Sequence, residues 1–243
     1  MVRCLMRRTV VSLSIRGRVR YHYRMQQSSG RRRERLPLLY RLFHYLVIPL
    51  ALRLCTRLRV EGREHLPAVG SVIVVSNHVD NWDTYVVGLF LRGRLINYLA
   101  RADGLRSRWL GWYWRQLGAI PADREGLALA LRTLKAGGAI GVFPEGQIAP
   151  ALAPAVAGSA VLALRSGAPV VPAAVWGTER IRPWSMLAPP RVTVRYGPPR
   201  VLKRAKGQDS QAVMDALMRE IAAMLPPRYR GAYSSLAEGR ESP

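Results

Sequence analysis

The sequence predicts an α/β fold with a mixed, mostly parallel sheet flanked by helices. Short apolar segments rich in β-branched residues, of which Val72–Ser76 is the clearest, alternate with segments of helical character. The chain has 243 residues, 49% of them hydrophobic, which is enough for one large domain with a terminal extension. No repeat of about 20 to 50 residues is visible, so repeat architectures are not indicated.

The expected strands and helices follow one another along the chain. Strands are expected at Arg57–Val60, Val72–Ser76, Ile96–Ala100, Ala139–Phe143, Pro169–Val175 and Val192–Tyr196. Helices are expected at Thr84–Leu91, Ser107–Leu117, Glu125–Ala136, Ser159–Arg165 and Gln211–Leu225. This alternation is typical of a mostly parallel sheet covered by helices. Pro172 lacks an amide N–H, so its strand is expected at an edge of the sheet or at a bulge.

The N-terminal part of the chain differs in composition from the rest. Residues 1–35 contain eleven arginines and one acidic residue, a net charge of +10. They lack the long apolar run and the cleavage site of a secretory signal. We expect a disordered basic leader here. It could be a transit-like segment, a membrane-contacting arm, or an upstream extension of a protein translated from Met25 rather than Met1.

Residues 36–56 are expected to form a helical segment at the membrane interface. The charge-free run from Leu42 to Leu52 has eleven residues, whereas a helix needs ~20 apolar residues to span a bilayer. Arginines flank the run on both sides, as in segments that lie among lipid headgroups. The alternative is an amphipathic helix packed on the domain. The main domain is then expected at residues 57–228, followed by a polar tail at 229–243.

The formal charge of +23 raises the possibility of a nucleic-acid partner. Nearly half of this excess lies in the leader, and the other 208 residues carry +13. No helix-turn-helix, zinc-finger or aromatic-basic motif is recognisable, so we expect no nucleic acid and instead a membrane surface with anionic lipids. Cys4 and Cys55 lie far apart and without metal-ligand spacing. They predict neither a disulfide framework nor a zinc site, which fits a reducing compartment.

The stretch SNHVDNWDTYVVG, residues 76–88, places His78, Asp80 and Asp83 directly after the Val72–Ser76 strand. Five residues of one ideal helix turn through about 500°, which would point His78 and Asp83 apart. The two meet only if His78 lies in the turn before a helix and Asp83 in its first turns. Asp83 would then accept from one ring nitrogen and leave the other as a base toward a hydroxyl. The alternative is a polar surface histidine, with Asp80 as the helix N-cap.

Two further stretches each contain the end of an apolar strand. GVFPEGQ, residues 141–147, holds Glu145 in a tight turn, which is either a functional carboxylate or an ordinary solvated one. LGAIPADREG, residues 117–126, places Asp123 as a helix N-cap and Arg124 in the first turn of that helix. A cation is unfavourable at that end of the helix dipole, which indicates that Arg124 holds an anion.

In order and spacing, these stretches resemble the glycerolipid acyltransferases, especially the lysophosphatidic acid (1-acylglycerol-3-phosphate) acyltransferases. Asn77–Asp83 is similar to the family block Asn-His-x4-Asp, and Gly118–Arg124 to the block that ends in arginine. Phe143–Gly146 spells the block Phe-Pro-Glu-Gly, and Val170–Pro172 is similar to the apolar strand with an inner proline. The resemblance covers roughly residues 37–200, and the four blocks in order are much more specific than any one of them.

The resemblance implies a glycerolipid acyltransferase-like fold and an O-acyltransferase. His78 would be the general base and Asp83 its orienting partner, and the acceptor alkoxide would attack the thioester carbonyl of acyl-CoA or acyl carrier protein. The implied substrate-binding positions are Asn77, Arg124, Phe143, Pro144, Glu145 and Gly146. No metal, cofactor or covalent acyl-enzyme is implied. The implied acceptor is a lysophospholipid, foremost 1-acylglycerol-3-phosphate, and the product is then phosphatidic acid. The enzyme would be a peripheral or monotopic protein at the cytoplasmic face of the cell membrane.

Two departures from the family pattern concern the acceptor. Family members commonly continue Phe-Pro-Glu-Gly with Thr-Arg-Ser, whereas this chain continues with Gln147, Ile148 and Ala149. A lysine that is common shortly before the position of Gly158 is also absent. Each lost charged hydrogen bond is worth about 1.5–3 kcal/mol. Either other arginines compensate, or the acceptor is a different lipid, or the protein is a catalytically weakened relative that binds lipid.

Overall fold

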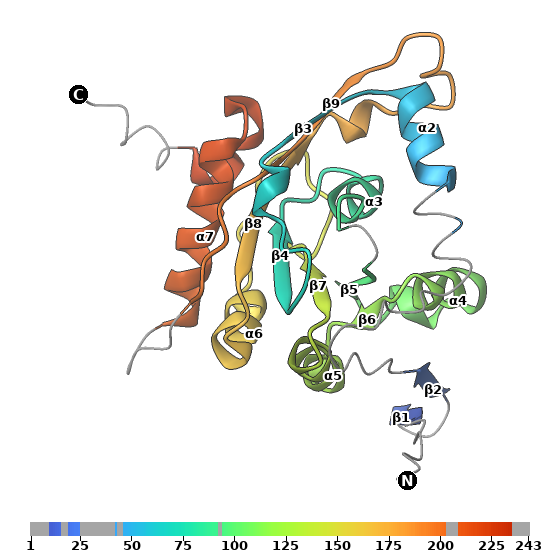
Figure 1. Cartoon of the computed structure of the whole chain (residues 1–243), viewed down its shortest axis with the longest axis vertical. Coiled ribbons are helices and arrows are strands. Elements are labelled where there is room, and N and C mark those ends of the chain that lie inside the picture. The colour runs from blue at the N-terminus through green and yellow to red at the C-terminus, as the bar shows by residue number, and fades with distance from the viewer. Residues whose placement is uncertain are drawn as a thin grey trace, which may run out of the picture.

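The structure is a computed structural model (Figure 1). A mixed sheet of seven strands forms its centre. The structure describes residues 10–15, 19–24, 42, 46–91, 94–202 and 209–234. The strands in spatial order are β3 (Arg57–Glu61), β9 (Arg191–Tyr196), β8 (Val170–Trp176), β4 (Val72–Ser76), β7 (Ala139–Val142), β5 (Ile96–Ala100) and β6 (Ile120–Pro121). From β8 to β6 all neighbours pair in parallel; β9 is antiparallel to β8, and β3 is parallel to β9. The prediction of a mixed, mostly parallel sheet is therefore confirmed.

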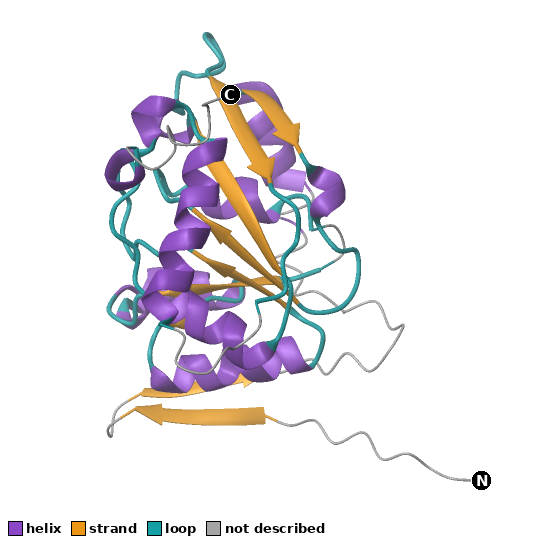
Figure 2. Cartoon of the chain, turned by 90° about the vertical axis from the view of Figure 1, so that its left-hand side faces the viewer, coloured by secondary structure: helices purple, strands orange, loops and turns teal. Residues whose placement is uncertain are grey.

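Helices cover both faces of this sheet (Figure 2). They are α2 (Ile48–Cys55), α3 (Asp83–Gly88), α4 (Arg108–Gln116), α5 (Arg124–Lys135), α6 (Gly158–Ser166) and α7 (Ser210–Met224). Each predicted helix is present within a few residues of its expected bounds. In the described part of the chain, none is long and apolar enough to cross a membrane.

The two faces of the central strand β4 explain its unbroken run of apolar residues. Ile73 and Val75 pack into a core with α5, α6 and α7, whereas Val72 and Val74 pack into a second core with α2 and α3. All five residues of β4 are buried. A parallel strand covered on both faces needs apolar side chains in both directions, so its sequence does not alternate.

Pro172 lies in β8, which has neighbours on both sides, so the expectation of an edge strand is wrong. The alternative, a local interruption, describes what is seen. Regular pairing of β8 with β9 stops at Ala173, and the next bridge joins Val170 to Arg200. Between these two pairs, the segment after β9 contains three residues and β8 contains two, as in a bulge. The carbonyl of Pro172 still accepts from the N–H of Gly197 at 2.8 Å, so the proline costs the sheet little.

The N-terminal region contains an antiparallel hairpin of β1 (Val10–Ile15) and β2 (Val19–Arg24). Over these two segments the chain differs from the disorder that we expect for residues 1–35, because both have the β-branched and aromatic residues that favour strands. The rest of the leader, and residues 36–41 and 43–45 of the interfacial segment, lie outside the described residues.

The C-terminal boundary of the domain lies later than we expect. Tyr229 and Tyr233, which fall in the predicted polar tail, are only 3% and 6% exposed and pack into the core beside α7. Aromatic side chains of this size contribute much buried apolar area, so they belong to the domain. The described domain therefore continues to Ser234.

Candidate active site

The carboxyl ends of the parallel strands lie at one edge of the sheet. Three of the four predicted blocks reach this edge, whereas the block Val170–Pro172 lies at the start of β8. His78 follows β4, Phe143 follows β7, Thr178 follows β8, and Arg124 follows β6. In α/β sheets this edge is where ligands bind, because strands end and helices begin there. The topology thus gathers residues that are a hundred positions apart in the sequence.

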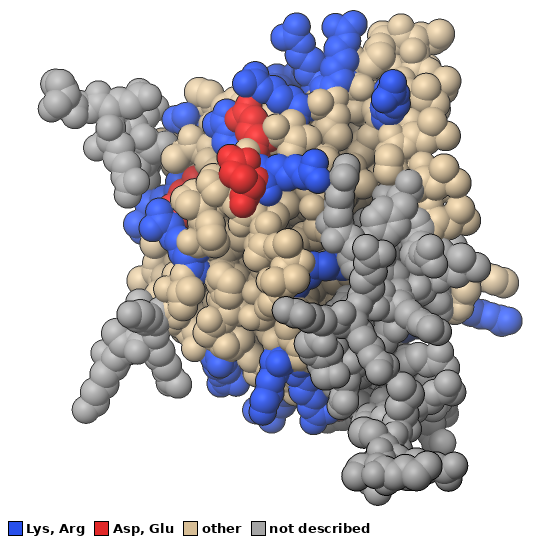
Figure 3. Space-filling model, in the orientation of Figure 1, with Lys and Arg blue, Asp and Glu red and all other residues tan. Residues whose placement is uncertain are grey.

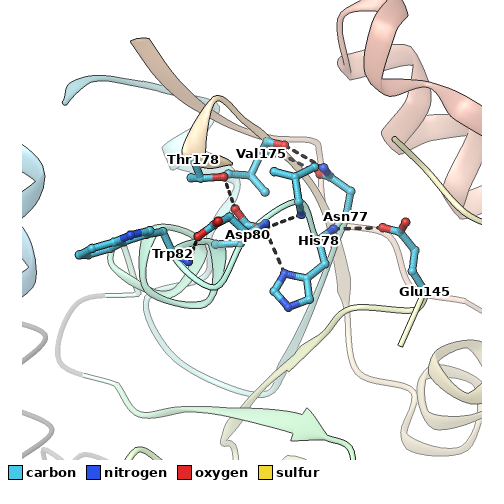
Figure 4. A network of polar contacts seen from close by, with 9 residues as sticks. Asn77, His78, Asp80, Trp82, Glu145, Val175 and Thr178 are labelled. Carbon is cyan, nitrogen blue, oxygen red and sulfur yellow. Dashed lines mark hydrogen bonds and ion pairs between the residues drawn. The ribbon is translucent and has the colours of Figure 1, made fainter. Parts of the chain in front are cut away.

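His78 and Asp83 form the hydrogen-bonded pair that the sequence predicts (Figure 4). His78 lies in the turn after β4, and Asp83 is the first residue of α3. The Nδ1–H of His78 donates to Asp83 Oδ2 at 3.0 Å. The Nε2 atom makes no hydrogen bond within the described part of the chain, and the side chain is 15% exposed. This nitrogen is placed to accept a proton from a bound molecule.

The carboxylate of Asp83 is fully buried and holds the turn around it. Its Oδ2 also accepts from the backbone N–H groups of Val79 at 2.6 Å and Asp80 at 2.8 Å. Burial raises the pKa of Asp83, while hydrogen bonds from His78, Thr178 and the backbone oppose that rise. Asp80 does not cap α3 itself; its Oδ1 accepts from the N–H of Trp82, which caps the preceding turn.

The residues directly after β8 supply a further partner of Asp83. Thr178 begins the short helix η4 (Thr178–Arg180) directly after β8, and its hydroxyl donates to Asp83 Oδ1 at 2.5 Å. Thr178 is 0% exposed, so no water replaces this donor. Sequence reasoning missed Thr178, because nothing in the chain order shows that β8 lies next to β4.

Asn77 joins the same two strands through its side chain. Its Nδ2 donates to the carbonyl of Val175 at 2.8 Å, and its Oδ1 accepts from the N–H of Val175 at 2.8 Å. The side chain is buried, and its amide group makes with β8 the two hydrogen bonds that the backbone of a neighbouring strand would make. In this structure Asn77 positions the turn that carries His78, and its substrate contact remains a prediction.

Phe143 supports the imidazole from one side. Its ring stacks on His78 with centroids 4.1 Å apart and on Tyr98 with centroids 5.4 Å apart. Gly141 makes this possible, because a Cβ there would lie 2.3 Å from the Tyr98 ring. The ring of His78 is therefore fixed both by its hydrogen bond and by stacking.

Both carboxyl oxygens of Glu145 accept backbone hydrogen bonds. Oε1 accepts from the N–H of His78 at 3.0 Å, and Oε2 accepts from the N–H of Ala153 at 2.8 Å. Burial raises the pKa of Glu145 to about 7, against the lowering effect of these two bonds. Glu145 thus links the turn of His78 to the loop after β7. Pro144 is buried in the same loop, and Gly146 is exposed with a φ of 66° that closes the turn.

Arg124 begins α5 and is exposed at the same edge of the sheet. The carboxylate of Asp123 caps α5 by accepting from the N–H of Gly126 at 2.7 Å, as predicted. Arg124 makes no hydrogen bond or ion pair with the described residues. By contrast, Arg101 is paired with Asp103 at 2.9 Å. Arg124 is therefore a cation without a protein partner in the described region.

A buried Asp–His pair with one outward ring nitrogen, at the carboxyl edge of an α/β sheet, is an arrangement that can act as a general base. Residues 57–176 match the family model described as Acyltransferase. The 1-acyl-sn-glycerol-3-phosphate acyltransferase of Bacillus subtilis (strain 168) is 28% identical over 124 residues, 49% of this chain and 62% of the relative. The 1-acyl-sn-glycerol-3-phosphate acyltransferase LPAT1, chloroplastic, of Arabidopsis thaliana is 26% identical over 157 residues, 59% of this chain and 44% of the relative.

The chain thus spans less than two thirds of the length of these curated relatives. Among solved structures, the 1-acyl-sn-glycerophosphate (LPA) acyltransferase PlsC from Thermotoga maritima matches with a TM-score of 0.57 and 24% identity, over 78% of this chain and 80% of that one. That structure shares the fold. These matches confirm the resemblance to the glycerolipid acyltransferases that the sequence blocks show.

Thr178→Val should destabilise the protein by about 1–3 kcal/mol, because it leaves one oxygen of a buried carboxylate without its donor. The pKa of Asp83 should also rise further, because a bond that favours the ionised form is lost. Urea unfolding and carbon-13 NMR titration of the carboxyl group measure the two effects. Thr178→Ser keeps the hydroxyl and is the matched control. If both variants titrate like the parent protein, the hydroxyl does not act on Asp83.

Glu145 should make stability depend on pH. Its pKa is higher in the folded than in the unfolded chain, so the folded protein holds this proton to higher pH. The free energy of unfolding of the parent protein, relative to that of Glu145→Gln, should therefore fall by about 2–3 kcal/mol as the pH rises from 5 to 8. Unfolding free energies of both proteins at several pH values measure this. Glu125→Gln, at an exposed position of α5, is the control, and a constant Glu145→Gln difference would contradict the expectation.

Proposed function

We propose that the protein transfers a fatty acyl group from acyl-CoA or acyl carrier protein to the hydroxyl of a lysophospholipid. The foremost acceptor is 1-acylglycerol-3-phosphate, and the product is then phosphatidic acid. The observation that carries the proposal is the His78–Asp83 pair with Nε2 directed away from the carboxylate. The names of the relatives supply the proposed substrate class.

In the proposed reaction, Nε2 of His78 takes the proton of the acceptor hydroxyl as the alkoxide attacks the thioester carbonyl. Asp83 stabilises the imidazolium that forms. The tetrahedral intermediate collapses to the ester and expels the thiolate, which receives the proton from Nε2. Positioning and one base supply much of the rate, because the thioester is already activated. The chain's own residues therefore suffice for every proton transfer.

The acceptor phosphate would bind at Arg124. This guanidinium is exposed at the carboxyl edge of the sheet and lacks a partner among the described residues. Arg182 is less suitable, since its Nη1 already donates to the carbonyl of Glu179 at 2.7 Å. Gln147, Ile148 and Ala149 add no cation after the Phe-Pro-Glu-Gly block. Phosphate recognition would thus depend strongly on this one arginine.

We further propose peripheral or monotopic association with the cytoplasmic face of the cell membrane, because the acceptor is a lipid. Leu46, Leu50 and Leu54 are exposed, whereas Ile48 and Leu52 are buried. This division is expected of a helix that lies between the domain and lipid. Anionic lipids would be favoured by the arginines around it.

His78→Ala should lower the rate of acyl transfer by roughly 10²–10⁴-fold, because the general base is lost. The assay uses labelled acyl-CoA in detergent with lysophosphatidic acid, lysophosphatidylcholine, lysophosphatidylethanolamine or no acceptor. His65→Gln, in the short helix η2 (Arg63–His65) after β3, is the matched control. Retention of most of the rate in His78→Ala would refute the mechanism. Transfer to another lipid alone would identify a different acceptor, and no transfer with any acceptor would favour a carrier-protein donor or a lipid-binding relative.

Arg124→Gln should raise KM for 1-acylglycerol-3-phosphate by roughly ten- to a hundredfold while kcat changes little, since one charged hydrogen bond is removed. Steady-state kinetics with varied acceptor at saturating donor measure the change. Arg132→Gln, exposed near the other end of α5, should keep the parent KM. An unchanged KM in Arg124→Gln would place the phosphate elsewhere.

A further inference from the structure

The loop between β8 and β9 exposes three large apolar side chains. Trp184 is 65% exposed, Met186 59% and Leu187 89%. The loop is nonetheless held in place: the Oγ of buried Ser185 accepts from the N–H of Arg182 at 2.8 Å, and the N–H of Leu187 donates to the carbonyl of Trp184 at 3.0 Å. Tight turns thus hold the apolar side chains in water, which is costly unless something covers them.

This loop adjoins the exposed face of α2. The N–H of Arg57, two residues after the end of α2, donates to the carbonyl of Pro190 at 2.8 Å, where the loop ends. In Figure 1, α2 and the loop before β9 lie together at one corner of the molecule. The exposed leucines Leu50 and Leu54 of α2, and Leu46 just before it, are spaced four residues apart and thus lie along one side. We call these leucines together with Trp184, Met186 and Leu187 the apolar corner.

The two segments that form the apolar corner carry only basic charges. Neither residues 46–60 nor residues 181–191 contain an aspartate or glutamate. Arg53, Arg182 and Arg191 are exposed in these segments. Figure 3 shows this corner as largely uncharged surface bordered by basic side chains. An apolar tip surrounded by arginines is complementary to an anionic bilayer, whose phosphates attract the cations while its acyl region accepts tryptophan and leucine.

The loop starts at the candidate active site. Its strand, β8, runs parallel to β4, so the loop and His78 emerge from the same edge of the sheet. Thr178, just after β8, is hydrogen-bonded to Asp83. Val69 and Val201, which are 82% and 59% exposed, lie at the opposite edge, before β4 and after β9. A bilayer at the apolar corner would therefore face the edge that carries the catalytic pair.

We propose that the β8–β9 loop is a second membrane-contacting element, which inserts together with α2 into the interface of an anionic bilayer. The inference rests on the proposed function in one respect, that the acceptor resides in the membrane. Insertion at two points would fix the orientation of the domain, whereas a single helix would leave it free to rotate about that helix.

The test measures binding without turnover. The purified full chain is sedimented with vesicles of phosphatidylcholine, with and without phosphatidylglycerol. Trp184→Gln with Leu187→Gln should lower the partition coefficient at least about tenfold, because two large apolar side chains no longer insert. Arg182→Gln should lower it about fivefold and only when phosphatidylglycerol is present. Val69→Gln with Val201→Gln is the matched control and should bind like the parent protein.

Parent-like vesicle binding of the Trp184/Leu187 variant would overturn the inference. So would a concentration-dependent dimer in sedimentation equilibrium that this variant abolishes, since a second copy would then cover the loop. His78→Ala should bind vesicles like the parent protein, so binding stands or falls independently of catalysis. Where transfer is observed, the Trp184/Leu187 variant should lose more activity on acceptor in vesicles than on a short-chain, monomeric lysophosphatidic acid. An equal loss on both would mean that the loop acts through Thr178 on the site, which also contradicts the inference.

Discussion

The arrangement of the site depends on one buried carboxylate. Asp83 accepts four hydrogen bonds that come from His78, Val79, Asp80 and Thr178, and thereby joins the turn after β4, the start of α3 and the end of β8. A carboxylate without water must be satisfied by protein donors, because an unpaired buried charge is very costly. The fold around it is therefore built to keep these donors in place, and the orientation of the imidazole follows from that requirement.

Most strands and helices, and the His78–Asp83 pair, are predictable from the sequence. Each strand and helix expected from alternation and apolar runs is present within a few residues, because these elements are set by local patterns. The His78–Asp83 pair was also predictable, since the turn and the first residue of the helix are adjacent in the chain. The conclusion that the two can meet only across a turn–helix boundary needed no tertiary information.

What the sequence could not show depends on which strands are neighbours. Thr178 and Val175 reach the site only because β8 lies beside β4, an order that chain position does not reveal. The same order makes Pro172 part of an inner strand, where its missing N–H falls at an interruption of the pairing with β9. The polar residues around Tyr229 and Tyr233 predict a tail, yet the rings of these two tyrosines pack into the core.

The stack of His78 on Phe143 has a consequence for the order of events in turnover. Nδ1 is bound to Asp83, and one face of the ring lies against Phe143. The imidazole ring therefore cannot flip by 180° without breaking both contacts. The nitrogen that receives a proton must then also release it, on the same side of the ring. In the proposed reaction the acceptor alkoxide attacks the thioester directly, without an acyl-enzyme, so donor and acceptor occupy the site together. The fixed nitrogen then passes the proton of the acceptor to the departing thiolate, and the kinetics should follow a ternary-complex scheme and not a ping-pong one.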